Sequence, residues 1–213
     1  THLAPANAQN LLINGGFEDP IVIDSGLHYQ HRNGTELSGW TSFSTYKGTV
    51  QFKSFYDTVT EGNQAVQIEV GGDWISQSFD TVIGQTYLLS YDLSAYDGYD
   101  DIGVLNVSVG SFAETVMGTS GGYSHQTLDF VADSITTTLK FENAYPTSAW
   151  YNYPHLDNVS VTAAVPEPEI YAMMGVGLGI MGWAARRKKK IKMLIPLTTA
   201  EKERVNPEFG SSV

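Results

Sequence analysis

The sequence contains no cysteine among its 213 residues. Disulfide bonds, thiol catalysis and cysteine-ligated zinc sites are therefore excluded. A chain of this length buries enough apolar surface on folding to be stable without cross-links, so the absence does not argue against a compact, exported domain.

Lysine and arginine are scarce before Pro166. Up to Val165 the chain has 4 Lys/Arg against 18 Asp/Glu, whereas from Pro166 onward it has 8 against 5. The formal charge of the first part is therefore about −14 and that of the second about +3, which together give the net charge of −11. Because nucleic acids are bound through clustered basic residues, the acidic body is not expected to bind nucleic acid or an anionic membrane. An acidic surface is compatible with divalent cations and neutral partners, although the negative charge can simply keep the protein soluble.

Helical periodicity over ten residues is absent before Pro166. Instead, short runs alternate apolar with polar residues, which places one set of side chains on a core and the other in water. Gly, Asn and Asp clusters separate the runs, and such spacing is typical of an all-β, antiparallel β-sandwich. The runs lie at residues 64–70, 74–80, 86–95, 105–110, 125–132, 137–144 and 156–163.

The first residues fit the end of a secretory signal. Ala6-Asn7-Ala8 matches the small-x-small pattern that precedes a signal-peptidase cut. Residues 1–8 are therefore interpreted as a signal-peptide remnant. The alternative is an N-terminus without fixed structure.

The C-terminal region changes texture at Pro166. Pro166 and Pro168 favour an extended linker, and Ile170–Ala185 follows as 16 residues without charge, closed by the basic run Arg186–Lys190. A membrane-spanning helix needs about 20 apolar residues, so this segment is short, and snorkelling by the basic side chains extends it slightly. We expect a short C-terminal transmembrane helix with its basic end in the cytoplasm and the β-domain outside.

The order of these three parts resembles the PEP-CTERM sorting signal, which we assign to residues 164–190. Its processing residues are Pro166, Glu167, Pro168, Arg186 and Arg187. The resemblance implies a substrate of exosortase, cut at or near Pro-Glu-Pro after a transient stay in the inner membrane of a Gram-negative bacterium. The product is then expected at the cell surface or in the exopolysaccharide matrix, as in a biofilm. A plain single-pass anchor is the alternative.

Residues 191–213 continue beyond the point where such signals normally end. Their last residues, NPEFGSSV, read like cloning-derived sequence or like a frame that runs past its natural stop. We expect a disordered tail and exclude it from the functional argument.

Residues 9–163 resemble the galactose-binding-like jelly rolls, in particular carbohydrate-binding modules of families 4, 9 and 22. The resemblance is carried by NLLINGGFEDP at residues 10–20, SGW at 38–40 and LDNVSVT at 156–162. It implies a jelly-roll sandwich with a structural calcium ion (Ca2+) that joins the first and last strands. Glu18 and Asp157 match the carboxylate ligands, and oxygen near Asn63 completes the shell of six to eight that calcium takes. The alternative is that Glu18 caps a turn and Asp157 lies at a strand edge.

Aromatic side chains in or beside loops are the candidate glycan contacts. Sugar rings stack their C–H faces on flat aromatic rings while their hydroxyls bond to nearby Asp, Asn and Gln. Tyr and Trp also cover loop edges, which is the alternative for part of this set, and Trp40 is expected in the core. The candidates are Trp74, Tyr96, Tyr99, Trp150, Tyr151 and Tyr153.

Other motifs give weaker signals. The acidic residues at 97, 100 and 101 lack EF-hand spacing and are interpreted as a solvated loop, with a second calcium site as the alternative. GTSGG at residues 118–122 matches G-x-S-x-G, but a strand and not a helix is expected after it, so a nucleophile elbow is rejected. His28 and His31 have no third ligand in the sequence nearby, and no carboxylate pair is placed for a glycosidase.

The expected function is therefore a non-catalytic carbohydrate-binding domain of an exported, exosortase-sorted protein. Its expected partners are a polysaccharide, exosortase and, before processing, the inner membrane. The alternatives are a structural matrix or adhesion protein without glycan affinity, and a polysaccharide hydrolase or lyase.

Overall fold

A computed structural model describes residues 9–23, 26, 28–54, 58–95, 102–145, 153–164, 176–183 and 186. The chain divides into two units, Thr1–Ala164 and Val165–Val213. The described part of the first unit is all-β. Its strands are β1 (Tyr29–Arg32), β2 (Thr41–Phe43), β3 (Thr49–Lys53), β4 (Gln64–Gln67), β5 (Trp74–Asp80), β6 (Thr86–Ala95), β7 (Ile102–Val109), β8 (Phe112–Thr119), β9 (Ser124–Val131), β10 (Thr136–Asn143) and β11 (Pro154–Ala163).

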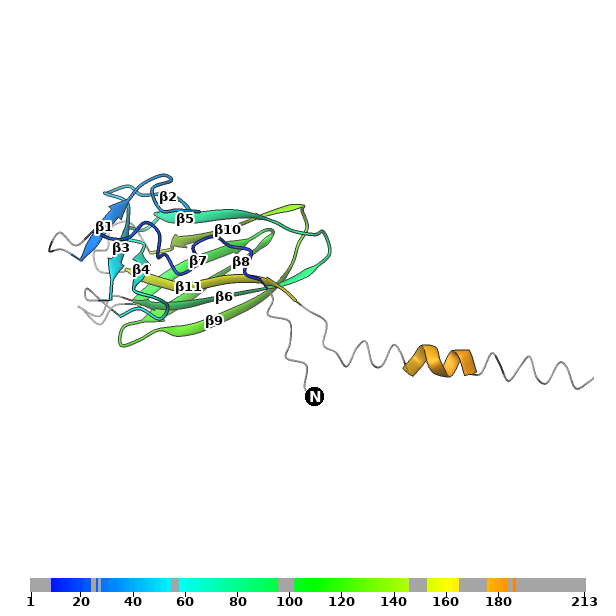
Figure 1. Cartoon of the computed structure of the whole chain (residues 1–213). Coiled ribbons are helices and arrows are strands. Elements are labelled where there is room, and N and C mark those ends of the chain that lie inside the picture. Colours follow the sequence, from blue (N-terminus) through cyan, green and yellow to red (C-terminus); the bar gives the residue numbers. More distant parts are fainter. Residues whose placement is uncertain are drawn as a thin grey trace, which may run out of the picture. The chain divides into compact units, whose positions relative to one another are not determined.

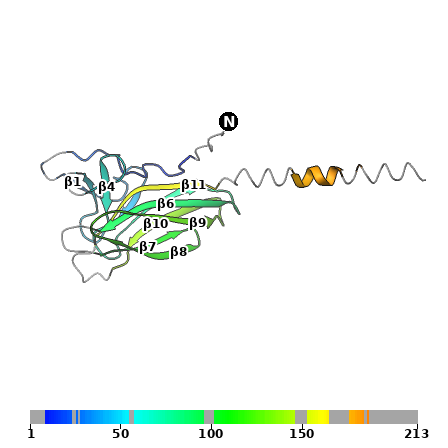
Figure 2. The ribbon, with the colours of Figure 1, turned by 90° about the horizontal axis from the view of Figure 1, so that it is seen from below.

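The strands form two antiparallel sheets that face each other (Figure 1 and, from below, Figure 2). Sheet A has the order β1-β3-β4-β11-β6-β9, and sheet B has the order β2-β5-β10-β7-β8. The last strand, β11, lies inside sheet A between β4 and β6. The predicted all-β antiparallel sandwich is thus confirmed.

Period-two alternation builds the core between the sheets. In β5, Ile75, Gln77 and Phe79 are buried on the side of the opposite sheet, whereas Ser76 and Ser78 between them are more exposed. Trp40 is 2% exposed and packs against Phe141 at a ring-centroid distance of 6.3 Å, as its sequence context predicts.

The N-terminal segment is bound to the last strand by hydrogen bonds. Leu11 N donates to Val161 O at 2.8 Å, and Val159 N donates to Gly15 O at 3.0 Å. A Cβ atom on Gly15 would lie 2.0 Å from Val159 O, so glycine permits this close approach. The first and last segments of the sandwich are therefore joined directly through their backbones.

The second unit contains a helix at residues 176–183, with Arg186 also helical. Its large apolar side chains, such as Leu178 and Trp183, are exposed. In the described part of the chain, no helix has the length and apolar character needed to cross a membrane. The spanning helix predicted over Ile170–Ala185 is therefore not shown, and residues 170–175, 184 and 185, like Pro166, Glu167, Pro168 and Arg187, lie outside the described residues.

Candidate functional site

The outer face of sheet B carries a row of side chains that crosses all five strands. Directly paired residues of antiparallel strands project to the same face of a sheet. The sequence neighbours Ile75 and Phe141 point into the core, so this row points outward. We call it the aromatic row, and from β2 to β8 it consists of Phe43, Trp74, Glu142, Asn106 and Thr115.

Trp74 is held between an aromatic and a cationic neighbour. Its ring stacks on Phe43 with centroids 5.9 Å apart and an interplanar angle of 20°, and Phe43 is 48% exposed. Lys140 Nζ lies 5.3 Å from the Trp74 ring centroid and also forms an ion pair with the Glu142 carboxylate. These contacts fix the orientation of a partly exposed indole and compensate the lysine charge.

Hydroxyl and amide groups lie on the same face, beyond Glu142 along the aromatic row. Thr115 Oγ1 donates to Asn106 Oδ1 at 2.7 Å. A second row parallel to the first includes Ser76, which pairs with Lys140. The face therefore combines a flat aromatic surface at the β2 edge with hydrogen-bonding groups towards β8, on an open sheet and not in a closed pocket.

Only two of the six predicted glycan-contact residues are described. Trp74 begins β5 in sheet B, while the half-buried Tyr153 directly precedes β11 in sheet A. Both lie at the end of the sandwich where β10 finishes. Glu142 of β10 pairs with Trp74. Pro154, which follows Tyr153, lies against Gly103 near the start of β7, where a Cβ atom would be 2.7 Å from Pro154 Cα. Tyr96, Tyr99, Trp150 and Tyr151, like the acidic positions 97, 100 and 101, lie outside the described residues.

The carboxylates predicted to bind calcium converge on one loop, residues 58–64. Glu18 Oε1 accepts hydrogen bonds from Asn63 N at 2.7 Å and Gln64 N at 2.8 Å. Asp157 Oδ2 accepts from Thr60 N at 2.6 Å and Glu61 N at 2.9 Å. Glu18 and Asp157, which were predicted as ligands, thus both bind the backbone of this loop. The third predicted ligand, Asn63, is part of the loop.

The donor set partly fits a calcium ion. Calcium needs six to eight oxygens, and Glu61 supplies a third carboxylate near the N-terminal segment, where a Cβ atom on Gly16 would lie 1.5 Å from its Oε2. However, the described residues contain no group of three or more His, Cys, Asp or Glu placed to hold a metal ion. The oxygens of Glu18 and Asp157 accept backbone N–H groups, so calcium stays a prediction.

Burial sets the ionisation of Asp157. Its side chain is 0% exposed, and this desolvation raises its pKa to about 6, against the lowering effect of hydrogen bonds from Glu61, Thr60 and Asn158. On the neighbouring strand, Asp92 Oδ1 lies 2.7 Å from His125 Nδ1. Desolvation alone would raise the pKa of Asp92, but hydrogen bonds with Thr60, His125 and Asn158 outweigh it and lower that pKa.

Further polar groups are buried on the outer face of sheet A. His155 is fully buried, its Nε2 lies 2.8 Å from Gln67 Oε1, and desolvation lowers its pKa to about 3. Near the sheet edge, His31 Nδ1 lies 3.9 Å from Glu69 Oε2. Burial, followed by the charge of Asp73, raises the pKa of Glu69 to about 7.

The structure places the residues of the weaker motifs on strands and in the connections beside them. The serine of residues 118–122 follows β8 and precedes β9, so strands and not a strand and a helix flank it. His28 lies in the connection before β1 and His31 lies within β1. Among the described residues, neither belongs to a metal-binding group.

Sequence reasoning missed Phe43, Lys140, Glu142, Asn106 and Thr115. Their meeting depends on the register of five strands, in which Phe43 pairs with Trp74 and Trp74 with Glu142. The alternation in each strand signals which residues share a face, but not which strand lies next to which.

Two family models match the chain. The model described as "Protein of unknown function (DUF642)" matches residues 10–162, and the PEP-CTERM protein-sorting motif matches residues 164–189. The sorting motif predicted from the sequence is therefore confirmed. No curated protein matches.

Solved structures with a similar strand arrangement include carbohydrate-binding modules. A CBM4 is 17% identical over 72% of this chain and 99% of its own, with a TM-score of 0.43. The CBM22-1 xylan-binding domain from Paenibacillus barcinonensis Xyn10C is 13% identical over 66% and 96%, with a TM-score of 0.45. TmCBM61, solved in complex with β-1,4-galactotriose, is 13% identical over 74% and 100%, with a TM-score of 0.46. Families 4 and 22 were named from the sequence, but likeness of this size does not bear on what this chain binds.

Proposed function

The chain belongs to the family described as "Protein of unknown function (DUF642)", and we propose that it is an exported, non-catalytic carbohydrate-binding β-sandwich. The glycan lies on the outer face of sheet B, along the aromatic row. The observation that carries this proposal is the oriented, partly exposed Trp74 ring, stacked on Phe43 and flanked by Lys140 and Glu142.

The chemistry of the face suits a neutral polysaccharide. The C–H side of a pyranose ring packs on the indole, and its hydroxyls exchange hydrogen bonds with Glu142, Asn106 and Thr115. Because Glu142 compensates the charge of Lys140, and because the body of the chain is strongly acidic, a polyanionic glycan is disfavoured. An open sheet face also accommodates internal sugar units of a polysaccharide, whereas a closed pocket selects the end of the polysaccharide.

The sorting motif supports a route to the surface. We place exosortase processing at or near Pro166, Glu167 and Pro168, after transient anchoring in the inner membrane of a Gram-negative bacterium. The processed sandwich then acts at the cell surface or in the exopolysaccharide matrix.

A glycan array tests the binding function. Residues 9–164, which contain the sandwich with its own core, are screened against neutral and acidic polysaccharides, alongside Trp74→Ala and the matched control Ile83→Ala. Ile83 is an exposed apolar residue beyond the opposite end of β5. We expect selective binding that Trp74→Ala weakens at least tenfold, or about 1.4 kcal/mol, and that Ile83→Ala leaves unchanged.

The negative outcomes point to the other two functions. A folded protein that binds no glycan would favour a structural matrix or adhesion role. Release of reducing sugar from a bound polysaccharide would instead indicate a hydrolase or lyase, and would contradict the non-catalytic assignment.

A further inference from the structure

The end of the sandwich where β11 finishes exposes four aliphatic side chains. Two come from the β5–β6 turn, one from the end of β9 and one from the β9–β10 turn. We call this set the apolar rim, and its members with their exposed fractions are Val82 (62%), Ile83 (62%), Val131 (59%) and Ile135 (71%).

Backbone hydrogen bonds hold the two turns together. Thr81 N donates to Ile135 O at 3.0 Å, and Gly84 N donates to Ala132 O at 2.8 Å. The Val82 backbone N–H is held as well, since it donates to Tyr87 Oη at 2.9 Å. Turns are usually built from polar residues and glycine, so exposed aliphatic side chains in and beside two turns that are bonded to each other are unusual and suggest a contact surface.

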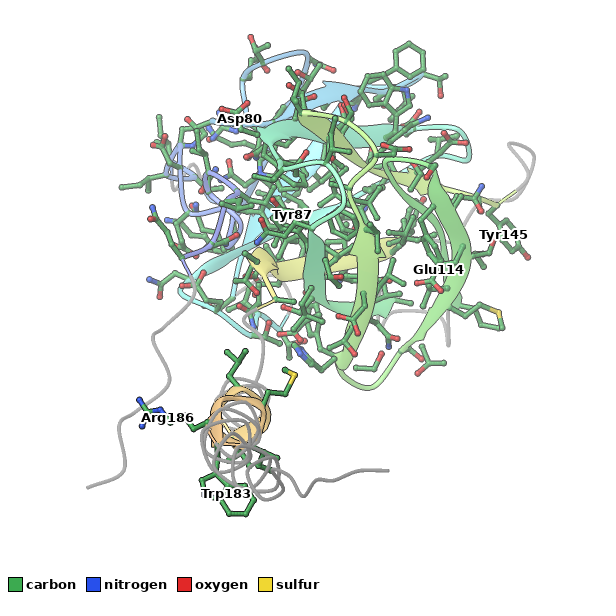
Figure 3. The ribbon with its side chains drawn as sticks, turned by 90° about the vertical axis from the view of Figure 1, so that its right-hand side faces the viewer. Asp80, Tyr87, Glu114, Tyr145, Trp183 and Arg186 are labelled. Atoms are coloured by element: carbon green, nitrogen blue, oxygen red, sulfur yellow. The ribbon has the colours of Figure 1, made fainter. Side chains whose placement is uncertain are left out.

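The chain leaves the sandwich at this same end. Ala164 N donates to Thr86 O at 3.0 Å, directly after the β5–β6 turn. Only five residues, 165–169, separate Ala164 from the uncharged run that starts at Ile170. Even fully extended, this length of chain spans about 20 Å. An anchored C-terminal segment therefore keeps this end of the sandwich close to the bilayer. Figure 3 looks onto this end, with Asp80 and Tyr87 labelled.

We propose that the apolar rim inserts into the interface of a zwitterionic lipid surface while the C-terminal segment anchors the chain, an inference that rests on the proposed anchoring. Residues 80–86 and 131–136 contain Asp80 and Asp133 but no lysine or arginine, and the exposed Asp129 lies next to them. These carboxylates disfavour an anionic surface. Aliphatic side chains at protruding turn tips match a lipid interface, which needs no complementary pocket.

Such docking would orient the glycan face. Val82 lies beyond the C-terminal end of β5, and Trp74 begins the same strand. The seven residues of β5 separate the two ends by about 20 Å. With the rim at the lipid, Trp74 and Phe43 lie at the end directed away from the membrane, where extracellular polysaccharide is accessible.

Single cysteines in this cysteine-free chain allow the contact to be measured. An environment-sensitive fluorophore is attached to Ile83→Cys, to Tyr46→Cys and to Val176→Cys in the full chain, reconstituted in phosphatidylcholine vesicles with a lipid-phase quencher. Tyr46 is a matched exposed residue (59%) at the far end, next to Thr45, which is hydrogen-bonded to Asp73 before β5. Val176 reports on the C-terminal segment.

We expect strong quenching at positions 83 and 176 and none at 46. Adding Val82→Ser and Ile135→Ser should reduce quenching at 83 severalfold, and so should phosphatidylglycerol vesicles. Quenching at 176 with position 83 as exposed as position 46 would overturn the rim proposal and leave the anchoring intact. Lack of quenching at 176 would overturn both, while glycan binding is decided separately on the array. Shielding of position 83 that requires added exosortase would assign the rim to a protein and also overturn the lipid proposal.

Discussion

Replacing Asp157 by asparagine removes a buried negative charge and preserves the size of the side chain. The wild-type carboxylate accepts hydrogen bonds from the backbone of Thr60, Glu61 and Asn158 and is 0% exposed. Burial raises its pKa from 3.8 to about 6 in the folded chain. Because the folded state holds the proton more tightly than the unfolded state, this group makes the protein less stable as the pH rises from about 4 to about 6.

The magnitude follows from the two pKa values. A difference between 3.8 and about 6 corresponds to about 3 kcal/mol of unfolding free energy. His155 titrates with the opposite sign, since its pKa is lowered to about 3, and it stabilises the folded state increasingly as the pH rises. The difference in unfolding free energy between wild type and Asp157→Asn cancels the His155 contribution and isolates Asp157.

Urea unfolding at pH 4, 5, 6 and 7 in EDTA measures this difference. At pH 4 more than half of the unfolded-state carboxyl group is already ionised, so wild type should lose about 2 kcal/mol relative to Asp157→Asn between pH 4 and pH 7. If calcium binds as the sequence predicts, excess calcium at pH 7 stabilises wild type and not the variant, because the ion needs the ionised carboxylate. A difference that stays constant with pH in EDTA would refute the argument that burial controls this group.

Four further predictions can be checked with the same unfolding assays. His155→Gln should lose less stability than wild type as the pH falls from 6.5 to 3. In wild type the imidazole is neutral when buried and takes up a proton on unfolding, which favours the unfolded state at low pH. Trp40→Phe should cost about 1–2 kcal/mol, since it removes the bond from Nε1 to Asn14 O at 3.0 Å, and equal stability would show that this bond contributes nothing. Gly15→Ala should destabilise by about 1–3 kcal/mol, because its methyl group would lie 2.0 Å from Val159 O. Chelation at pH 7 should lower the melting temperature of wild type, and an unchanged temperature would contradict structural calcium.

The sequence predicts six internal strands and the edge strand β9, but it misses three of the four edge strands of the described sheets. All seven alternating runs correspond to strands β4 to β7 and β9 to β11. The strands it misses are β1, β2, β3 and β8, of which β1, β2 and β8 form sheet edges. An edge strand buries less surface, so its residues need not alternate strictly. In β3 the reverse holds, since four consecutive residues are buried and even Gln51 lies inside, with its amide donating to Phe17 O at 2.7 Å.

The sequence predicted Trp74 in the candidate site but not the residues that surround it. A tryptophan between a Gly-Gly-Asp turn and an alternating run signalled an exposed ring at Trp74. Its neighbours Phe43 and Glu142 lie 31 residues before it and 68 residues after it, and meet it only through strand register. Likewise, the motifs around Glu18 and Asp157 predicted that the two carboxylates approach each other, but not that backbone N–H groups of residues 60–64 would occupy them.

The position of β11 inside sheet A has a mechanical consequence. This strand is paired with β6 over most of its length and with β4 near its start, and it runs directly towards the C-terminal sorting segment. Antiparallel hydrogen bonds lie perpendicular to the strand. A pull on the C-terminus along β11 therefore loads many of them in shear at once, whereas a pull on an edge strand such as β8 would peel them one after another. A sandwich attached to a surface by this terminus, and to polymer by its face, is held at the strand best placed to resist force.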